Sequence, residues 1–200
     1  MVTTAVVPRK SGTIIEVVGI DGSGKSTVVA ALVAELHGTL RKVSPFSATI
    51  HATAARIESS IGEEPALAFR ACAIAEALIG EAADAKQGPQ IFDRYIEAAK
   101  MFFSVQGTRP LSDSVLDALP QPDLVVLLEI DVELAMTRRL RPSHASPSAE
   151  QSYLRSCADY FRRKAQSSPW SVVDASQSLD VVVGLAAAHA RSVAADASVS

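Results

Sequence analysis

The sequence predicts a single α/β domain, residues 1–200, built on a parallel β-sheet, and three observations support this fold class. Short apolar runs alternate with longer segments whose apolar residues recur at helical spacing, a pattern typical of a parallel sheet covered by helices. The first run, Ile14–Val18, is almost continuously aliphatic, as expected of a strand buried on both faces. The 200 residues with 48% hydrophobic content suit one domain with a sizeable core.

The elements follow in order from their residue types. Strands are expected at five short aliphatic runs bounded by glycine, proline or polar residues: 13–18, 39–43, 90–92, 124–128 and 170–173. Helices are expected where apolar residues recur three and four positions apart: 25–36, 49–61, 64–86, 96–104, 112–119, 132–141, 149–166 and 178–193. Residues 1–12 are expected to form a loose tail, and residues 195–200 a frayed end.

Two acidic residues stand out within these elements. Glu16 interrupts the aliphatic first strand, so we expect it either near an edge of the sheet or facing a polar pocket. Asp131 precedes the helix at 132–141 and can cap its first turn, because aspartate accepts hydrogen bonds from the first free N–H groups of a helix.

A glycine-rich turn directly after the first strand carries the motif G-x-x-x-x-G-K-[ST] of a phosphate-binding loop. Its residues are Gly19, Ile20, Asp21, Gly22, Ser23, Gly24, Lys25 and Ser26, followed by Thr27. Glycines let successive backbone N–H groups surround phosphate oxygens, and the start of the next helix adds partial positive charge. Lys25 would neutralise the β- and γ-phosphates, and the Ser26 hydroxyl would ligate Mg²⁺. A connection that merely needs glycine does not explain Lys25 and Ser26, so we predict a nucleotide site.

Polar residues also end two other predicted strands. Asp93 and Arg94 follow the strand at 90–92, and Asp174 and Ala175 follow Val173. Ligands collect at the carboxyl ends of parallel strands, so these residues are expected beside the phosphate loop. Arg94 is placed to contact the acceptor or the transferring phosphate, and Asp93 to orient magnesium-bound water. The alternative is a structural salt bridge, which is weak at a surface; position at a strand end favours the functional interpretation.

A cationic cluster, Arg138, Arg139 and Arg141, precedes a proline- and serine-rich segment at 142–148. One interpretation is structural, since cations near a helix C-terminus are favourable in their own right. The other is a lid over 138–150 that supplies positive charge only when substrate is bound. In that case Arg138 and Arg141, one helical turn apart, are the catalytic candidates.

The composition limits the classes of partner and compartment. A net charge of -3 argues against a general nucleic-acid or anionic-membrane binder. No apolar stretch has the length of a signal peptide or of a membrane span. Cys72 and Cys157 lie in apolar helical patterns and are expected to be reduced core thiols. We therefore expect a cytoplasmic protein without nucleic-acid or membrane partners.

Together these motifs resemble the thymidylate kinase family. The resemblance rests on four stretches that occur in that family's order and at its approximate spacing: Gly19–Thr27, Asp93–Tyr95, Pro122–Asp123 and Val173–Ser176. It implies a three-layer P-loop NTPase fold, with a five-stranded parallel sheet flanked by helices and a short lid. It also implies phosphoryl transfer from ATP, with Mg²⁺, to a deoxynucleoside monophosphate, and a homodimer.

The resemblance also implies roles for individual residues. Asp21 would meet the acceptor sugar and Arg94 the acceptor phosphate, while Asp174 and Ala175 would lie near the adenine of ATP. The phosphate loop has no arginine between Asp21 and Gly24. The family subtype that lacks this arginine carries basic residues in the lid instead, in agreement with the cluster at 138–141.

The acceptor side departs from the family pattern. Val18 stands where the family has an acidic residue, and 44–55 offers no clear counterpart of an arginine that holds the acceptor phosphate. The family's Phe-x-x-Asp-Arg helix is matched by Phe69-Arg70-Ala71-Cys72-Ala73, so the aromatic residue is kept and the base-reading arginine is replaced by alanine. Loss of such hydrogen-bonding groups changes base choice by orders of magnitude.

Three side chains remain candidates for this altered acceptor pocket. Phe46 and Phe69 either stack on a base or pack in the core, and Arg70 faces the acceptor only if the helix shifts its register. The leading interpretation is therefore a thymidylate kinase-like enzyme acting on dTMP or on a modified or other pyrimidine nucleotide.

Two alternatives stay open. The chain could be a P-loop kinase of a different small molecule, or a degenerate ATP-binding regulator. A GTPase switch is disfavoured because the chain contains no asparagine, and the base-reading motif Asn-Lys-x-Asp is therefore missing.

Overall fold

The computed structural model describes residues 12–41, 48–83, 88–105, 116–139 and 146–197. Its strands form one sheet in the order β2-β3-β1-β4-β5, and every neighbouring pair is parallel. The strands are β1 (Ile14–Val18), β2 (Thr39–Arg41), β3 (Gln90–Asp93), β4 (Leu124–Glu129) and β5 (Ser171–Asp174). The predicted five-stranded parallel sheet is confirmed.

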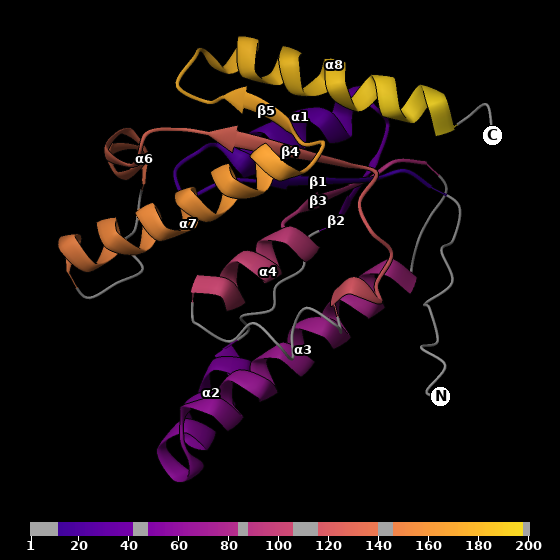
Figure 1. Cartoon of the computed structure of the whole chain (residues 1–200). Helices are drawn as coiled ribbons and strands as arrows, with labels where there is room; N and C mark the ends of the chain where they lie inside the picture. The colour runs from indigo at the N-terminus through magenta and orange to yellow at the C-terminus, as the bar shows by residue number, and fades with distance from the viewer. Residues whose placement is uncertain (1–11, 42–47, 84–87, 106–115, 140–145, 198–200) are drawn as a thin grey trace.

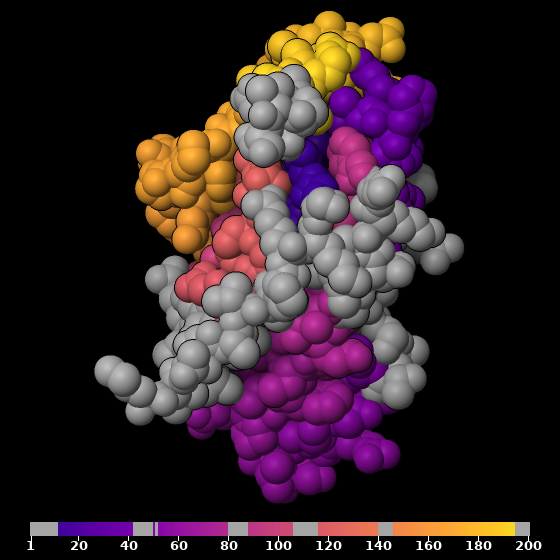
Figure 2. Space-filling model, turned by 90° about the vertical axis from the view of Figure 1, so that its right-hand side faces the viewer, coloured from indigo at the N-terminus to yellow at the C-terminus, as the bar shows by residue number. Residues whose placement is uncertain are grey.

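Helices cover both faces of this sheet and give three layers (Figure 1). They are α1 (Lys25–Glu35), α2 (Ala48–Ile61), α3 (Glu63–Ala83), α4 (Ile96–Val105), α6 (Val132–Arg138), α7 (Pro147–Ser167) and α8 (Leu179–Ala197). Helices α1 and α8 lie together on one face, and α4 and α7 on the other. Helices α2 and α3 pack against each other and form the end of the molecule opposite α8 (Figure 2). Among the described helices, none combines the length and apolarity needed to traverse a bilayer.

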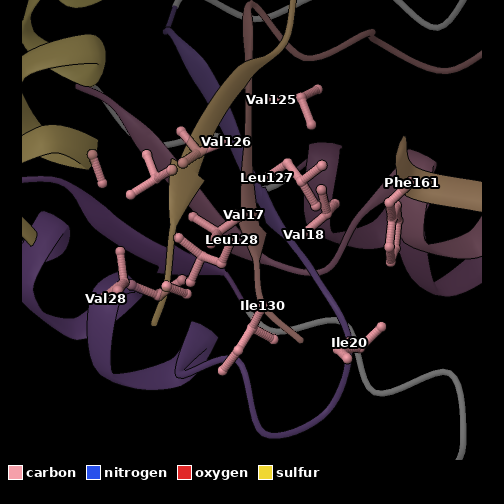
Figure 3. Close-up of a cluster of buried hydrophobic side chains, with 14 of the residues drawn as sticks. Val17, Val18, Ile20, Val28, Val125, Val126, Leu127, Leu128, Ile130 and Phe161 are labelled. Carbon is pink, nitrogen blue, oxygen red and sulfur yellow. The ribbon is translucent and has the colours of Figure 1, made fainter. Parts of the chain in front are cut away.

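The core lies between the central strands and these helices. The larger cluster joins β1 and β4 to α1, α7 and α8 and includes Val17, Val28, Leu128 and Phe161 (Figure 3). A second cluster joins β3 to α3 and α4. Burying one such aliphatic or aromatic side chain contributes about 1.5–3 kcal/mol, so packing against the sheet, more than helix propensity, holds the helices in place.

Glu16 lies in the middle of the central strand and is 0% exposed. Of its two expected positions, the one near a sheet edge is wrong, because β1 has β3 on one side and β4 on the other. Its surroundings are instead polar on one side: its carboxylate accepts hydrogen bonds from backbone N–H groups at the start of α4.

Local predictions differ from the structure at several places. Helix α6 ends at Arg138, three residues before its predicted end, and α8 continues to Ala197, into the segment that was expected to fray from residue 195. Helix α7 begins at Pro147, two residues before the predicted start, because the Ser146 hydroxyl accepts the N–H of Ala149 and Pro147 occupies the first turn. The expectation that both cysteines are core thiols is wrong for Cys72, which is exposed, whereas Cys157 is buried. An alanine-rich helix such as α3 gives little indication of which of its faces packs.

Candidate active site

The ends of three strands bring the predicted site residues to one edge of the sheet. β1 leads into the phosphate loop, β3 ends at Asp93, and β5 ends at Asp174. Because the sheet is parallel, these carboxyl ends lie on the same side, where ligands of such sheets bind. Helix α6, which follows β4, stands at this edge as well (Figure 1).

The phosphate loop takes a shape that depends on glycine. Gly22 and Gly24 have φ angles of 93° and 89°, in the left-handed region that disfavours other residues. A Cβ atom on Gly22 would approach the carbonyl oxygen of Ala135 to 2.2 Å, so the loop packs directly against α6. Gly24 is the N-cap of α1 and no side chain caps this helix. An uncapped helix start is a favourable place for an anion.

Lys25 is 6% exposed and lies under the loop. Its Nζ donates to the carbonyl oxygen of Ile20 at 2.8 Å and lies 3.5 Å from Asp21 Oδ1. Burial and the nearby Arg94 guanidinium outweigh the carboxylates Asp21 and Asp93, and lower the pKa of Lys25 to about 8. The ammonium is therefore held in a site that lacks enough negative charge, as expected where an anionic ligand binds.

Asp21 stands among three cations. Arg94 Nη2 donates to its Oδ1, and Lys25 Nζ and Arg139 Nη2 lie 3.5 Å and 3.8 Å away. Burial raises the pKa of Asp21, but Arg94, Lys25 and Arg139 more than offset this and hold it below its usual value. We call these four side chains the Asp21 cluster.

Ser26 and Asp93 meet beside the cluster. The Ser26 hydroxyl donates to Asp93 Oδ2 at 2.8 Å, which brings together the two residues that the sequence assigned to Mg²⁺. A hydroxyl and a carboxylate are the oxygen donors that Mg²⁺ prefers, so their chemistry fits the ion. Among the described residues no group of three or more histidine, cysteine, aspartate or glutamate side chains could hold a metal.

The two described arginines at the end of α6 contact different parts of the site. Arg138 donates to the carbonyl oxygens of Ala175 at 2.7 Å and Ser176 at 3.5 Å, next to the predicted adenine site. Arg139 approaches Asp21 and pairs with Glu150, which is 3% exposed. Arg141 lies outside the described residues. The sequence favoured Arg138 and Arg141 as the lid cations, whereas the structure brings Arg139 to the Asp21 cluster.

The turn after β5 is well ordered by its own contacts. Asp174 Oδ1 accepts hydrogen bonds from the N–H and the hydroxyl of Ser176 at 2.9 Å and 2.6 Å. Ala175 is buried, and its N–H donates to the carbonyl oxygen of Glu129 at 2.7 Å. Arg138 thus contacts the backbone of this turn at Ala175 and Ser176.

The predicted base-pocket residues are less closely tied to the cluster. Phe69 and Arg70 lie half-buried on α3, and in the described part of the chain no hydrogen bond or ion pair links them to the phosphate loop. Arg70 Nε is buried without a hydrogen-bond partner among those residues. Phe46 lies outside the described residues.

Two charged residues of this edge escaped the sequence analysis. Arg41 ends β2 and is 6% exposed, just before the stretch where no acceptor-phosphate arginine was found. Glu150, in the first turn of α7, is 3% exposed and pairs with Arg139. Charged side chains are seldom buried, but their burial depends on contacts across the fold, which the local sequence does not contain.

This edge can neutralise and orient phosphate groups. Lys25, Arg94 and Arg139 come from different elements and converge on one carboxylate, while the loop backbone supplies N–H groups. Phosphoryl transfer needs mainly such positioning and charge neutralisation. The arrangement therefore fits a donor phosphate at the loop and an acceptor beside Arg94.

Comparison with known proteins gives a consistent result. The thymidylate kinase family model matches residues 17–185. A probable thymidylate kinase of Archaeoglobus fulgidus is 31% identical, covering 84% of this chain and 90% of the relative. A thymidylate kinase of Cupriavidus pinatubonensis is 30% identical, over 82% and 90%. The solved thymidylate kinase of Candida albicans shares the fold, with a TM-score of 0.66 at 19% identity, over 91% and 92% of the two chains.

Proposed function

Because the chain belongs to the thymidylate kinase family and is thus a nucleoside monophosphate kinase, we propose that its Asp21 cluster performs the phosphoryl transfer. The donor is ATP and the acceptor is dTMP or a modified or other pyrimidine nucleoside monophosphate. The observation that carries this assignment is the convergence on Asp21 of Lys25, from the start of α1, and Arg94, from the turn after β3. Arg94 is thereby held next to the donor phosphates.

On the donor side, Lys25 and the N-terminus of α1 bind the β- and γ-phosphates of ATP. The Ser23 hydroxyl is buried and has no hydrogen-bond partner among the described residues, so it can donate to a phosphate oxygen at little cost. Arg138 and the turn Asp174–Ser176 line the place of the adenine. Arg138 can stack on the ring, because a guanidinium packs well against an aromatic face.

On the acceptor side, Arg94 binds the acceptor phosphate, and Asp21 the sugar. In the structure these two side chains neutralise each other, and substrates take over the contacts when they bind. Arg139 provides further positive charge as the transferring group moves between the two phosphates. Arg41, at the end of the neighbouring β2, is a candidate for the missing acceptor-phosphate arginine.

Ser26 and Asp93, which contact each other, would hold Mg²⁺ through the Ser26 hydroxyl and a water bound by the Asp93 carboxylate. The ion, when bound, neutralises the β- and γ-oxygens of ATP. The residues themselves only position it. Ser26 lies in the first turn of α1 and Asp93 ends β3, so both stand on rigid elements, which suits a site whose geometry must be accurate.

The acceptor pocket and the assembly complete the proposal. Phe69 stacks on the acceptor base together with Phe46, and Arg70 contacts the acceptor. Without the family's base-reading arginine, discrimination between pyrimidine bases is expected to be weak. We also propose a homodimer, as in the family, and a cytoplasmic location, which agrees with two free cysteines in the described residues.

A panel of nucleoside monophosphates, each supplied with ATP and Mg²⁺ in a coupled ADP-release assay, tests this function directly. At least one pyrimidine monophosphate should be turned over, with kcat in the usual range for kinases of about 1–100 s⁻¹. Binding of ATP without turnover of any monophosphate would instead favour the ATP-binding regulator. Turnover of a nucleoside or of another small molecule would favour a P-loop kinase with a different acceptor.

Two variants test the residue assignment. Lys25→Ala should abolish measurable turnover, and Arg94→Ala should lower kcat at least a hundredfold, because each removes a charge that stabilises the transition state. As a control, Arg191→Ala removes an exposed cation of α8 that pairs with Glu35 at the end of α1. This variant should keep wild-type rates. Full activity of both site variants would place the chemistry elsewhere.

A further inference from the structure

Glu16 is a buried charge that the proposed reaction does not use. It lies on β1, three residues before the phosphate loop, and is 0% exposed. A carboxylate in the middle of a sheet is strongly unfavourable unless hydrogen bonds compensate it. Its contacts therefore indicate what it stabilises.

Within the described part of the chain, Glu16 makes three hydrogen bonds, and they all go to the segment that follows Arg94. Glu16 Oε1 accepts the N–H of Tyr95 at 2.8 Å and that of Ala98 at 3.0 Å, and Oε2 accepts the N–H of Glu97 at 3.0 Å. These N–H groups belong to the first turn of α4 and have no partner within the helix. Glu16 thus caps α4 from a neighbouring strand.

Tyr95 cannot cap the helix itself. It occupies the position before Ile96, where serine or aspartate usually provides the cap. Its hydroxyl donates to the carbonyl oxygen of Pro120 at 3.0 Å, and its ring packs on Phe92 with centroids 4.2 Å apart. The carboxylate of Glu16 takes the place of the missing cap.

Arg94 needs this support because its backbone is unusual. Its φ angle is 76°, a left-handed conformation that residues other than glycine seldom adopt. Before it, Asp93 lies in register with Val17 of β1. After it, Tyr95 is held by Glu16. The turn is therefore fixed at both ends by the same strand, and Arg94 projects between them.

We propose that Glu16 is a positioning residue for the acceptor: its hydrogen bonds to Tyr95, Glu97 and Ala98 fix the turn that presents Arg94 to the acceptor phosphate. This inference rests on the proposed role of Arg94. Two carboxylates then hold the turn. Glu16 binds the backbone of the residues that follow Arg94, and Asp21 binds the Arg94 guanidinium. None of these three hydrogen bonds reaches Lys25 or the phosphate loop, which form the donor side.

Ionisation of Glu16 supplies a readout that simple packing lacks. Burial outweighs the three hydrogen bonds and, with the Glu97 charge, raises the pKa of Glu16 to about 7. Glu97 is itself paired with Lys100, which also contacts Asp117. When Glu16 is protonated, one oxygen becomes an O–H donor and can no longer accept an N–H in the same way. Arg94 should then be less well positioned.

The first experiment compares wild type with Glu16→Gln, which has the same shape but one acceptor oxygen fewer. At pH 8 the KM for the acceptor monophosphate should rise about tenfold, in line with the loss of a hydrogen bond to a charged group. The KM for ATP should change less than twofold. The ratio of the acceptor KM of Glu16→Gln to that of wild type should fall as the pH decreases from 8 to 6. Using this ratio removes the effect of protonation of the acceptor's own phosphate, because both proteins bind the same acceptor.

A second variant, Glu97→Gln, keeps the three backbone hydrogen bonds and removes the neighbouring negative charge. It should shift the pH dependence of the acceptor KM to lower pH and leave its value at pH 8 within twofold. This variant decides the question if Glu16→Gln does not fold. An unshifted profile in Glu97→Gln would then reject the positioning role.

The outcomes separate this inference from the proposed function. If wild type turns over no monophosphate, the function is wrong, independently of Glu16. If wild type is active and folded Glu16→Gln has an unchanged acceptor KM, the inference is overturned. An equal loss of affinity for ATP and acceptor would also overturn it, because Glu16 would then only support the fold.

Discussion

At the scale of single residues, the site is governed by an excess of positive charge around one carboxylate. Lys25, Arg94 and Arg139 share Asp21. Of these three side chains, Lys25 is the least exposed to solvent. Burial of Lys25 and the repulsion from the nearby Arg94 guanidinium raise the free energy of the charged form of Lys25, because three cations share one anion. A phosphate group relieves the imbalance.

The first prediction concerns the pH dependence of ATP binding. The pKa of Lys25 in the free protein is about 8, so the ammonium is present below this pH and is lost above it. The affinity for a non-hydrolysable ATP analogue, measured by titration calorimetry, should be constant below pH 7. It should weaken as the pH rises from 8 to 9.5, by up to about tenfold per unit.

Arg94→Gln is the matched variant for this measurement. It removes the guanidinium that lowers the pKa of Lys25 and frees Asp21 to pair with the ammonium. The decline in affinity should therefore begin at higher pH than in wild type. Affinities that stay flat to pH 9.5 in both proteins would show that Lys25 keeps its ordinary pKa.

At the scale of elements, α6 links the two halves of the site. It has only seven residues, and its end carries Arg138, which contacts Ala175, and Arg139, which approaches Asp21. A helix this short is unstable by itself. Its position depends on the N-cap at Asp131 and on packing against the phosphate loop at Gly22.

The second prediction follows from that cap. Asp131 Oδ1 accepts the N–H groups of Glu133 at 2.9 Å and Leu134 at 3.2 Å, so Asp131→Ala should cost about 1 kcal/mol. For a chain of this size the Tm should fall by about 2–4 °C, and the KM for ATP should rise. Thermal unfolding and steady-state kinetics give both values. Asp159→Ala, which removes an exposed partner of Arg162 on α7, should change neither.

At the scale of the whole molecule, the buried Glu16 makes stability depend on pH. Its pKa in the folded protein is about 7, whereas the ordinary pKa of a glutamate side chain is 4.5, so between these values the folded state binds more protons than the unfolded state. The free energy of unfolding therefore falls as the pH rises through this window. The contribution is largest below pH 4.5 and is lost above pH 7.

The third prediction puts a magnitude on this effect. Urea unfolding of wild type between pH 5 and 8 should show a loss of about 2–3 kcal/mol that is absent in Glu16→Gln, since one pKa unit corresponds to about 1.4 kcal/mol. The difference between the two proteins removes the titration of all other groups. Parallel pH profiles would mean that Glu16 titrates near its ordinary pKa when folded.

The parts of this molecule that could be predicted from sequence are those determined by local pattern. Residue type and spacing predict the strand Ile14–Val18 and the phosphate loop that follows it, and the alternation of strands and helices predicts the parallel sheet. The cap of α4 could not be predicted, since Glu16 and Tyr95 meet only through the pairing of β1 with β3. Which of the two adjacent arginines, Arg138 or Arg139, reaches Asp21 depends on how α6 ends. The exposure of Cys72 depends on which face α3 turns toward the sheet.

The position of β1 also has a consequence for synthesis of the chain. β1 is made first, but its partners in the sheet begin at Gln90 and Leu124, so on the ribosome it must wait for most of the chain. An unpaired aliphatic strand is prone to form β-structure with other chains. Glu16 places a negative charge in the middle of that stretch while it is solvated and fully ionised. The residue that caps α4 in the folded protein is therefore expected also to oppose association of the unpaired strand with other chains.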